Sequence, residues 1–372
     1  MIATLSAALT VAATVASPQM PSAVLSSPAA TPPVQMSLAW MPGAVRCDRM
    51  TVAATAMRRP LTGLIWQGQP EAPRSVTYRF RIDATGRPLS IARDGSGYVV
   101  QAEDIAPSLA ASRFPAGAGR DDCAITYTAR LSPMATAPVA DLIAYSITPT
   151  AGALPRAGWE RIMPPATGCG IYPRPQALMR AYPDFRALPT TPGVRNWSMV
   201  GYDLDRRGRP VRVRTVEGTR NAALDAASVK AVAASRFTPG ARTGCLYPYR
   251  RNPGTITAPP LPDRIGTLAT GDHCPAGEWT YRPTPNYPPA WHRRAIEGWA
   301  VVAFDVAPWG DIGNVRIVAS EPAADFGTAA MQLLRGARKP VSETGHSGCI
   351  ERVRFVMPAG TATPANPVPA DD

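Results

Sequence analysis

Six cysteines are the residues of this chain whose type and spacing could do chemistry. Taken in order as consecutive pairs, they are separated by 76, 76 and 75 residues. Thiols can form disulfides in an oxidising compartment, or they can bind a metal ion. Because six cysteines allow fifteen pairings, the regular spacing is the observation that selects among them. The cysteines are Cys47, Cys123, Cys169, Cys245, Cys274 and Cys349.

A glycine in a turn-forming sequence lies between the members of each pair. The glycines Gly86, Gly208 and Gly310 follow the first cysteine by 39, 39 and 36 residues. Two similar octapeptides, AASRFPAG at Ala110–Gly117 and AASRFTPG at Ala233–Gly240, come after the first two glycines. We therefore predict one module in three copies, each with one disulfide. This scheme pairs Cys47 with Cys123, Cys169 with Cys245, and Cys274 with Cys349.

A metal site is the alternative use of these cysteines. The three histidines, His273, His292 and His346, lie only in the last copy, where two of them are close to Cys274 and Cys349. A site with two cysteines and two histidines can be imagined there. However, there is no CxxC, and the first two copies keep the cysteines without the histidines. We therefore expect disulfides, no metal and no cofactor.

The pattern around each turn glycine predicts a hairpin, then a helix, then a closing strand. Apolar and polar residues alternate on both sides of the turn, as in half-buried strands. The predicted hairpin strands are Val76–Ile82 with Leu89–Ile91, Val200–Leu204 with Val211–Val213, and Trp299–Val306 with Val315–Ala319. The predicted helices are Ile105–Leu109, Leu224–Ser235 and Phe326–Leu334, and the closing strands are Ala124–Tyr127, Leu246–Arg250 and Ile350–Met357.

Copies two and three also have a Tyr-Pro sequence ahead of the hairpin. It opens a short predicted helix in Ala181–Leu188 and in Asn286–Gly298. The expected fold class is α+β, with two helices on a three-stranded antiparallel sheet in each module. The predicted modules are residues 45–133, 160–255 and 264–358, with a disordered tail at 359–372.

The N-terminal segment favours export. Residues 1–23 contain the apolar run Ile2–Ala16, which indicates a signal peptide with cleavage near Ala16 or Ala23. An uncleaved anchor is the alternative, because no Lys or Arg precedes the run, although a spanning helix needs about 20 residues. Residues 24–44 are expected to be a flexible, proline-rich lead-in. The predicted location is the periplasm, or the inner membrane facing the periplasm if the segment is retained.

The charge of the chain is basic and is almost entirely due to arginine. The net charge is +12, and of 39 basic residues only Lys230 and Lys339 are lysine. Such a balance can indicate nucleic acid or a membrane surface as a partner. The arginines are scattered along the sequence without a dense basic run, so we expect no nucleic-acid partner. Membrane contact is expected only if the N-terminal segment is retained.

This order of short motifs resembles the C-terminal domain of the TonB energy-transducer family. That family has Tyr-Pro before a short helix, Glu-Gly before the first strand, a glycine turn, and Arg-Phe-x-Pro before the last strand. Copy one lacks the Tyr-Pro, and copy three has Arg338, Lys339 and Pro340 in place of Arg-Phe-x-Pro. The matching residues are Tyr287, Pro288, Glu297, Gly298 and Gly310 in copy three; Tyr182, Pro183, Gly208, Arg236, Phe237 and Pro239 in copy two; and Gly86, Arg113, Phe114 and Pro115 in copy one.

The resemblance implies a non-catalytic periplasmic module for transmembrane transport that binds the N-terminal peptide of outer-membrane TonB-dependent receptors, or another envelope protein. The peptide would add to the last strand of the sheet. The implied edge is Ile350–Phe355 and, less well, Leu246–Arg250, where Pro248 lacks a donor. The alternative interpretation is that Arg352 and Arg354 are ordinary solvent-exposed residues of an edge strand and have no binding role. The candidate residues are Ile350, Arg352, Val353, Arg354 and Phe355.

Two other functions compete with peptide binding. The modules could form a structural scaffold or spacer, since residues 1–42 contain no histidine of the kind that the family's membrane anchor bears. An enzyme is the other class, but no GxSxG, HExxH or glycine-rich phosphate loop occurs. Asp203 and Asp205 share one face of a strand beside a turn, where aspartate is ordinary. Trp291 and Trp309 could be contact residues, or could belong to the core or to a turn.

Overall fold

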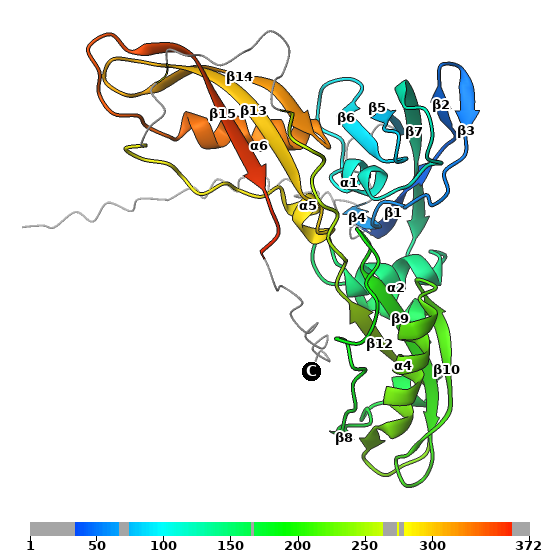
Figure 1. The fold of residues 1–372 in the computed structure, drawn as a ribbon. Coiled ribbons are helices and arrows are strands. Elements are labelled where there is room, and N and C mark those ends of the chain that lie inside the picture. Colours follow the sequence, from blue (N-terminus) through cyan, green and yellow to red (C-terminus); the bar gives the residue numbers. More distant parts are fainter. Residues whose placement is uncertain (1–33, 67–73, 165–166, 263–273, 275–278, 359–372) are drawn as a thin grey trace, which may run out of the picture. The chain divides into compact units, whose positions relative to one another are not determined.

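The computed structural model describes residues 34–66, 74–164, 167–262, 274 and 279–358 (Figure 1). The predicted signal peptide or anchor, residues 24–33 of the lead-in and the whole predicted tail at 359–372 lie outside these residues. The described chain is a mixed α/β protein whose strands form sheets of seven, three, two and three strands. No helix in these ranges is long and apolar enough to cross a membrane.

The first large sheet has seven strands instead of the three expected. Its hairpin of β5 (Ser75–Ile82) and β6 (Pro88–Arg93) pairs through β5 with the closing strand β7 (Arg120–Pro133). The helix α1 (Ile105–Ala110) belongs to the same part of the chain, and no second helix occurs among residues 45–66 and 74–133. The four further strands are β1 (Gln35–Pro42), β2 (Val45–Cys47), β3 (Met50–Val52) and β4 (Gly63–Trp66).

The expected lead-in at residues 24–44 is wrong for Gln35–Pro42. These residues form β1, which pairs with both β4 and β7. Leu38 and Trp40 are buried in the core that β5 and β7 also line. Ser37–Trp40 contains no proline, so the backbone donors that a strand needs are present.

The second sheet consists of β9 (Asn196–Leu204), β10 (Pro210–Gly218) and β12 (Arg242–Arg251), with β9 in the centre. The helix α4 (Ala222–Ala234) packs against it and begins at Asn221, whose side chain accepts the amide hydrogen of Leu224. Two short strands, β8 (Ala177–Met179) and β11 (Arg236–Phe237), pair beside it.

The helix predicted in Ala181–Leu188 is not present, and the segment contains a turn instead. The amide of Arg186 donates to the carboxylate of Asp184, which closes the turn locally. Pro183 and Pro189 leave only five residues between them. So short a stretch gives too few hydrogen bonds to offset the cost of starting a helix.

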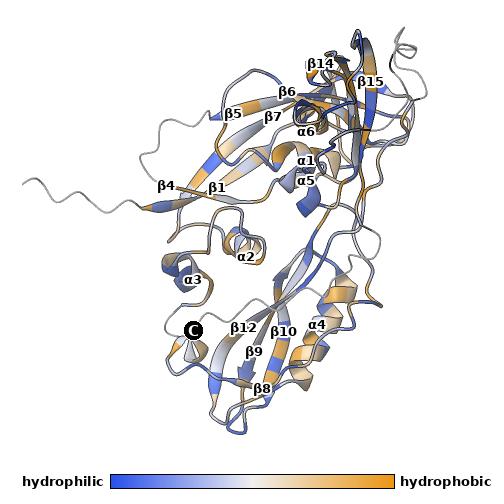
Figure 2. Cartoon of the chain, turned by 90° about the vertical axis from the view of Figure 1, so that its left-hand side faces the viewer, coloured by the Kyte–Doolittle hydropathy of each residue, from blue (hydrophilic) through white to orange (hydrophobic). Residues whose placement is uncertain are grey.

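The third sheet has the predicted arrangement of two helices and three strands. The central strand β13 (Gly298–Val306) pairs with β14 (Ile312–Glu321) and β15 (His346–Phe355). The helix α5 (Pro289–Arg293) starts with a proline, and α6 (Ala324–Arg335) packs on β13 and β14. Figure 2 shows both hydrophilic and hydrophobic residues on β15. They alternate over its last four residues, Arg352–Phe355, as expected for a strand with one buried face.

Two helices that the sequence reading did not predict lie between the first two sheets. They are α2 (Val139–Ile147) and α3 (Arg156–Ile162), followed by the short 3₁₀ helix η1 (Gly168–Gly170). Leu142 and Ile143 of α2 share a core with Trp197 and Met199 of β9. The second sheet is therefore covered on the face opposite α4.

Three disulfides join Cys47 to Cys123, Cys169 to Cys245, and Cys274 to Cys349. In each case the second cysteine lies in the closing strand, β7, β12 or β15. Cys47 lies within the first sheet, in β2, directly opposite Cys123. His273 is outside the described residues; within them, no group of three or more His, Cys, Asp and Glu is placed to hold a metal ion.

The three turn glycines have the same backbone surroundings. Each has a positive φ, +81°, +71° and +91° in chain order. A Cβ added at any of them would lie 2.1 Å from a carbonyl oxygen, that of Phe114, Phe237 or Lys339. Only glycine tolerates both the φ value and this close approach. The same three residues donate their amide hydrogens to the carbonyl oxygens of Gly86, Gly208 and Gly310.

Candidate functional site

The candidate site is the outer edge of β15. This strand pairs with β13 along its length, from Phe355 opposite Gly298 to His346 opposite Val306. On the other side of β15, the described part of the chain has no strand. An edge of this kind presents backbone donors and acceptors to an added strand.

The side chains of β15 divide between two faces. Val353 and Phe355 are buried in the core with α6, whereas Arg352 and Arg354 are exposed on the opposite face. Arg352 lies opposite Val301, and Arg354 lies opposite Trp299. Ile350 is half-buried on the same face as the two arginines. The five candidate residues therefore lie on one strand but not on one face.

The motif residues of the third sheet fix the end of this edge. The ring of Phe355 is 5.3 Å from the ring of Phe326 and 5.8 Å from that of Tyr287. The hydroxyl of Tyr287 donates to the carbonyl oxygen of Ile296 at 2.6 Å, and burial raises the pKa of Tyr287 above its usual range. The carboxylate of Glu297 accepts the amide hydrogen of Met357 at 2.9 Å, just beyond β15.

A charged cluster lies on the helix side of β15. Glu351 pairs with Arg282 at 2.6 Å, and the ammonium of Lys339 lies 4.2 Å from the centre of the Trp279 ring. Burial raises the pKa of Glu351, while Arg282 and Lys339 act in the opposite direction. Burial also lowers the pKa of Lys339. This cluster fixes the orientation of β15 near its middle.

The first sheet shows what an added strand looks like at this position. There, β7 pairs with β5 as β15 pairs with β13. The opposite edge of β7 is covered by Pro42–Met36 of β1, antiparallel to Tyr127–Pro133, and by β2 at Cys123 and Ala124. The sequence reading missed β1, although Leu38 and Trp40, two residues apart in a stretch with proline only at its end, were a signal for it.

The second candidate edge is β12. It pairs with β9, and the described residues place no strand on its other side. Pro248 lies opposite Met199 and has no amide hydrogen. The ring of Tyr247 is covered by the guanidinium of Arg180, 3.7 Å from its centre. These features make β12 a poorer template than β15.

The other sequence candidates have local structural roles. The carboxylate of Asp205 accepts the amide hydrogens of Arg207 and Arg209 within the turn, and Asp203 pairs with Arg212. Trp291 is fully buried in the core. Trp309 is 66% exposed in the third turn and donates to Asp311.

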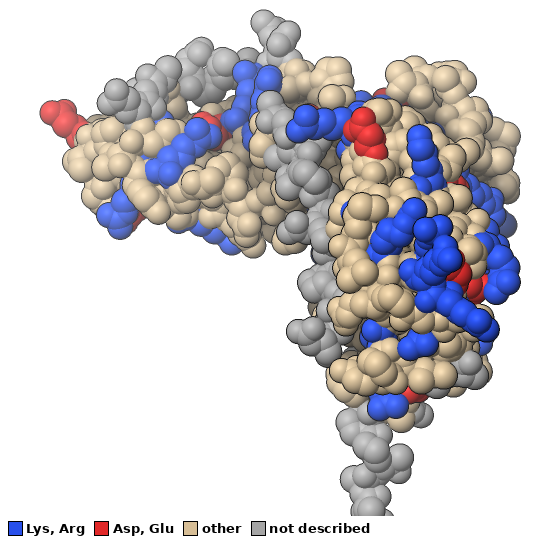
Figure 3. Space-filling view, turned by 90° about the horizontal axis from the view of Figure 1, so that it is seen from below, with Lys and Arg blue, Asp and Glu red and all other residues tan. Residues whose placement is uncertain are grey.

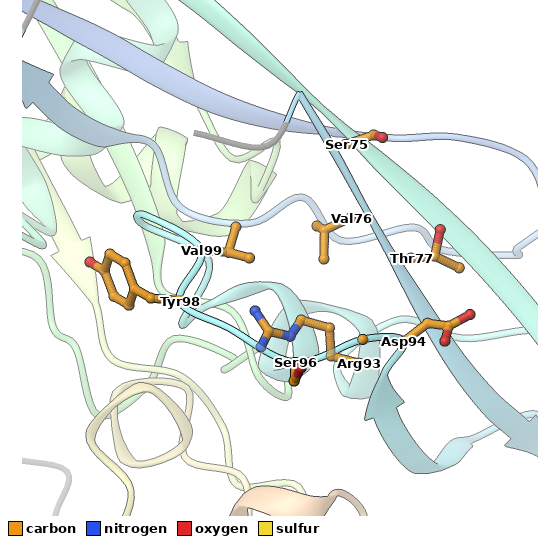
Figure 4. A pocket seen from close by; sticks show the side chains of 9 residues that line it. Ser75, Val76, Thr77, Arg93, Asp94, Ser96, Tyr98 and Val99 are labelled. Atoms are coloured by element: carbon orange, nitrogen blue, oxygen red, sulfur yellow. The ribbon is translucent and has the colours of Figure 1, made fainter. Parts of the chain in front are cut away.

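A hollow of about 350 Å³ lies beside β5 and the loop after β6 (Figure 4). Ser75, Val76 and Thr77 of β5 line one side, and Arg93, Asp94 and the loop to Val99 line the other. Its carboxylate, Asp94, is paired with Arg79 at 3.2 Å. None of the candidate residues named in the sequence analysis lines this hollow. We therefore take the edge of β15 as the candidate site.

Comparison with known proteins places the family resemblance in the third sheet. Residues 283–356 match the family model of the Gram-negative bacterial TonB protein C-terminal. The matched range contains α5, β13, β14, α6 and β15, and thus the whole candidate edge. A comparison with curated proteins gives no match. The match supports a TonB C-terminal domain in this part of the chain.

Proposed function

We propose that this chain is a non-catalytic cell-envelope protein whose third sheet binds an extended peptide by strand addition at β15. The peptide belongs to an outer-membrane TonB-dependent receptor or to another envelope protein. The observation that carries the proposal is β1 on β7, because it supplies an antiparallel added strand at the edge that corresponds to the outer edge of β15. The family match over residues 283–356 supports it.

The proposal includes three TonB-like modules, at residues 45–133, 160–255 and 264–358. The shared hydrogen bonds at the three turn glycines support this division. Ring pairs support it as well: Phe80 with Phe114 at 5.9 Å, and Tyr202 with Phe237 at 5.5 Å, join hairpin to turn in the first two sheets. In the third sheet, Phe304 has Trp279 as its partner at 5.9 Å.

The proposed location is the periplasm, with an inner-membrane anchor facing the periplasm as the alternative. A TonB-like domain implies the cell envelope, and the apolar run Ile2–Ala16 agrees with export. A role in TonB-dependent transport follows only if the bound peptide belongs to a receptor.

A structural scaffold is the second candidate function. The observation in its favour is the buried ion pair between Arg294, which follows α5, and Asp104, which precedes α1. Such a pair would fix the first and third modules to one another. A rigid spacer needs that contact but does not need an open edge.

Site-specific photo-crosslinking in the full chain tests the peptide proposal. A benzophenone side chain replaces Arg352 on β15 in one variant and Arg316 on β14 in the matched control. Both positions are exposed and lie beside the central strand, opposite Val301 and Ala303. With a labelled N-terminal receptor peptide, we expect an adduct from position 352 and none from position 316.

Equal labelling at both positions, or no adduct at either, would overturn strand addition at β15. The scaffold function would then remain, and it is tested separately by the stability of the Arg294–Asp104 contact. A peptide shuffled in sequence but equal in composition serves as the negative control for the ligand.

A further inference from the structure

The positive charge of the chain is concentrated in one part of it. Residues 160–255 contain 16 Lys and Arg against six Asp and Glu, which is ten of the twelve net positive charges. The sequence distributes these arginines without a dense run, but the fold collects several of them at one end of the second sheet. Lys and Arg prevail over Asp and Glu on the face seen from the β8 side (Figure 3).

Hydrogen bonds join three separate segments at this end. The amide of Phe237 donates to the carbonyl oxygen of Gly208 at 3.0 Å, and the amide of Thr238 donates to that of Gln176 at 2.9 Å. The turn between β9 and β10, the loop after β11 and the residues before β8 therefore lie together. We call this surface the basic tip; it consists of Arg174, Leu178, Met179, Arg206, Arg207 and Arg209.

The arginines of the basic tip are available to an external anion. All four are exposed, and none forms an ion pair with any residue that the structure describes. The nearby acids are engaged within the fold. Asp205 accepts two amide hydrogens of its own turn, and Asp203 is held by Arg212 at 2.5 Å and by the amide of Gly244.

Exposed apolar side chains accompany these charges. Leu178 is 67% exposed and Met179 is 51% exposed, although both belong to the strand β8. Their strand partner is β11, in which Phe237 lies opposite Ala177 and is buried. Leu178 and Met179 are successive residues of β8 and both are exposed in the part of the fold that also contains the four arginines. Interfacial membrane binding uses this combination, because the charges bind headgroups and the apolar groups enter the acyl boundary.

The corresponding turns lack this combination. In the first sheet the turn contains Arg87, whose guanidinium donates to the carbonyl oxygen of Thr257. In the third sheet, Ala307–Asp311 contains no basic residue. The feature is thus specific to the second sheet and is not a property of the turn itself.

We propose that the basic tip docks on an anionic lipid surface. Arg174, Arg206, Arg207 and Arg209 contact the headgroup phosphates, and Leu178 and Met179 enter the interface. Nucleic acid would use the same charges but would leave the aliphatic side chains exposed to water. The proposal is independent of strand addition at β15 and does not require retention of the N-terminal segment.

Co-sedimentation of the full chain with vesicles tests the docking. The probes are vesicles of phosphatidylcholine alone and vesicles that also contain phosphatidylglycerol. The tip variant is Arg206→Gln/Arg207→Gln/Arg209→Gln. Its matched control is Arg46→Gln/Arg49→Gln/Arg74→Gln, which removes the same charge from exposed positions of the first sheet. Residues 1–33 are identical in all proteins, so their contribution cancels.

We expect the unmodified chain to bind the anionic vesicles in a manner that weakens with salt. The tip variant should bind about 100-fold more weakly, at roughly fivefold for each arginine removed, and the control should lose far less. A second variant, Leu178→Ser/Met179→Ser, should keep the salt-dependent binding but lose about tenfold in affinity. Both changes are at exposed positions, so circular dichroism should match the unmodified chain.

Three outcomes would overturn the proposal. The first is equal loss of binding in the tip variant and in its control. The second is equal binding to neutral and anionic vesicles. The third is binding of a DNA oligonucleotide as tightly as the anionic vesicles, with no effect of Leu178→Ser/Met179→Ser on either, because that result would assign the arginines to nucleic acid.

Discussion

At the scale of the residue, the third sheet lacks the phenylalanine that follows the helix in the other two sheets, and a tryptophan from another segment takes its place in the packing. Phe114 and Phe237 pack against a ring of the hairpin, but Lys339 occupies the equivalent position after the third turn. Trp279 supplies the missing ring, and the ammonium of Lys339 lies over its face. A cation over an indole is favourable when partly desolvated. Where the other sheets have a phenylalanine, the third sheet therefore has a contact between Lys339 and Trp279, which are far apart in the sequence.

We expect the ionisation of Asp325 to lower the stability of the folded chain. Burial raises its pKa above the usual 3.8, although the indole N–H of Trp291 donates to it at 2.6 Å. Between pH 3.8 and the raised pKa the folded chain keeps a proton that the unfolded chain releases. Stability therefore falls as the pH rises through this window and stays lower above it. Asp325→Asn, which keeps an acceptor for Trp291, should raise the free energy of unfolding at neutral pH.

Denaturant unfolding at several pH values measures this effect, with Asp205→Asn as the control of opposite sign. Hydrogen bonds from the amides of Arg209 and Arg207 lower the pKa of Asp205. Its contribution is therefore present above pH 3.8 and is lost as the pH falls through the lowered pKa. The first variant should gain stability at neutral pH and the second should lose it, and both differences should vanish in acid. Changes of the same sign would contradict the assignment.

At the scale of the element, β1 shows that a strand can be added to a closing strand of this type. It contributes Leu38 and Trp40 to the core of the first sheet, and its backbone pairs with both β4 and β7. Trp40→Ala should lower the free energy of unfolding by about 3–5 kcal/mol, because a large buried side chain is removed. Denaturant unfolding measures this loss. Limited proteolysis should then cut within residues 34–43 before the rest of the chain.

The matched control for this prediction is Trp66→Ala. Trp66 lies at the end of β4, next to β1 in the sheet, but it is exposed. Its replacement should cost little stability and should not expose β1 to protease. If Trp40→Ala were equally harmless, β1 would not be an integral strand of the sheet.

The sequence predicts the elements around the three turn glycines better than the elements between them. The hairpins, α4, α6 and the closing strands follow from alternation, alanine-rich periodicity and glycine turns, all of which are local signals. The helix expected at Ala181–Leu188 fails because two prolines leave too few residues between them. β1 has a weak local signal in the spacing of Leu38 and Trp40. α2 is stabilised by Leu142 in a core formed with β9, and such a contact has no local signature. The edge of β15 was predictable, whereas the role of Glu297 at its end was not.

At the scale of the whole molecule, the first and third sheets share one hydrophobic core. Ile91 and Phe326 belong to the same buried cluster, and the amide of Ile91 donates to the carbonyl oxygen of Pro322 at 2.9 Å. Glu321 accepts hydrogen bonds from Arg81 at 2.8 Å and from the amide of Ser90 at 2.6 Å. These contacts join residues more than 200 positions apart. Contacts between residues so far apart in the sequence carry a large loop-closure cost and are associated with slow folding.

Arg294 forms several hydrogen bonds where the first and third sheets meet. Its side chain is 8% exposed, and that of its partner Asp104 is 5% exposed. Its guanidinium contacts both carboxylate oxygens of Asp104, at 2.7 and 2.5 Å, and also donates to the carbonyl oxygens of Gly193 and Arg59. Asp104 in turn accepts the amide hydrogen of Leu61 at 2.7 Å. One ion pair therefore connects segments of all three predicted modules.

Removing one member of this pair should be more harmful than removing both. Asp104→Asn leaves the guanidinium of Arg294 buried without a counter-charge, and loss of a single partner from a buried pair costs about 3–5 kcal/mol. Asp104→Leu/Arg294→Met replaces both charges with apolar groups of similar length and should recover much of that loss, as measured by denaturant unfolding. Glu160→Gln, which removes the exposed pair with Arg156, should have little effect, because solvent screens such pairs. If Asp104→Asn were as mild as Glu160→Gln, the contact would not hold the predicted modules together, and the scaffold function would lose its support.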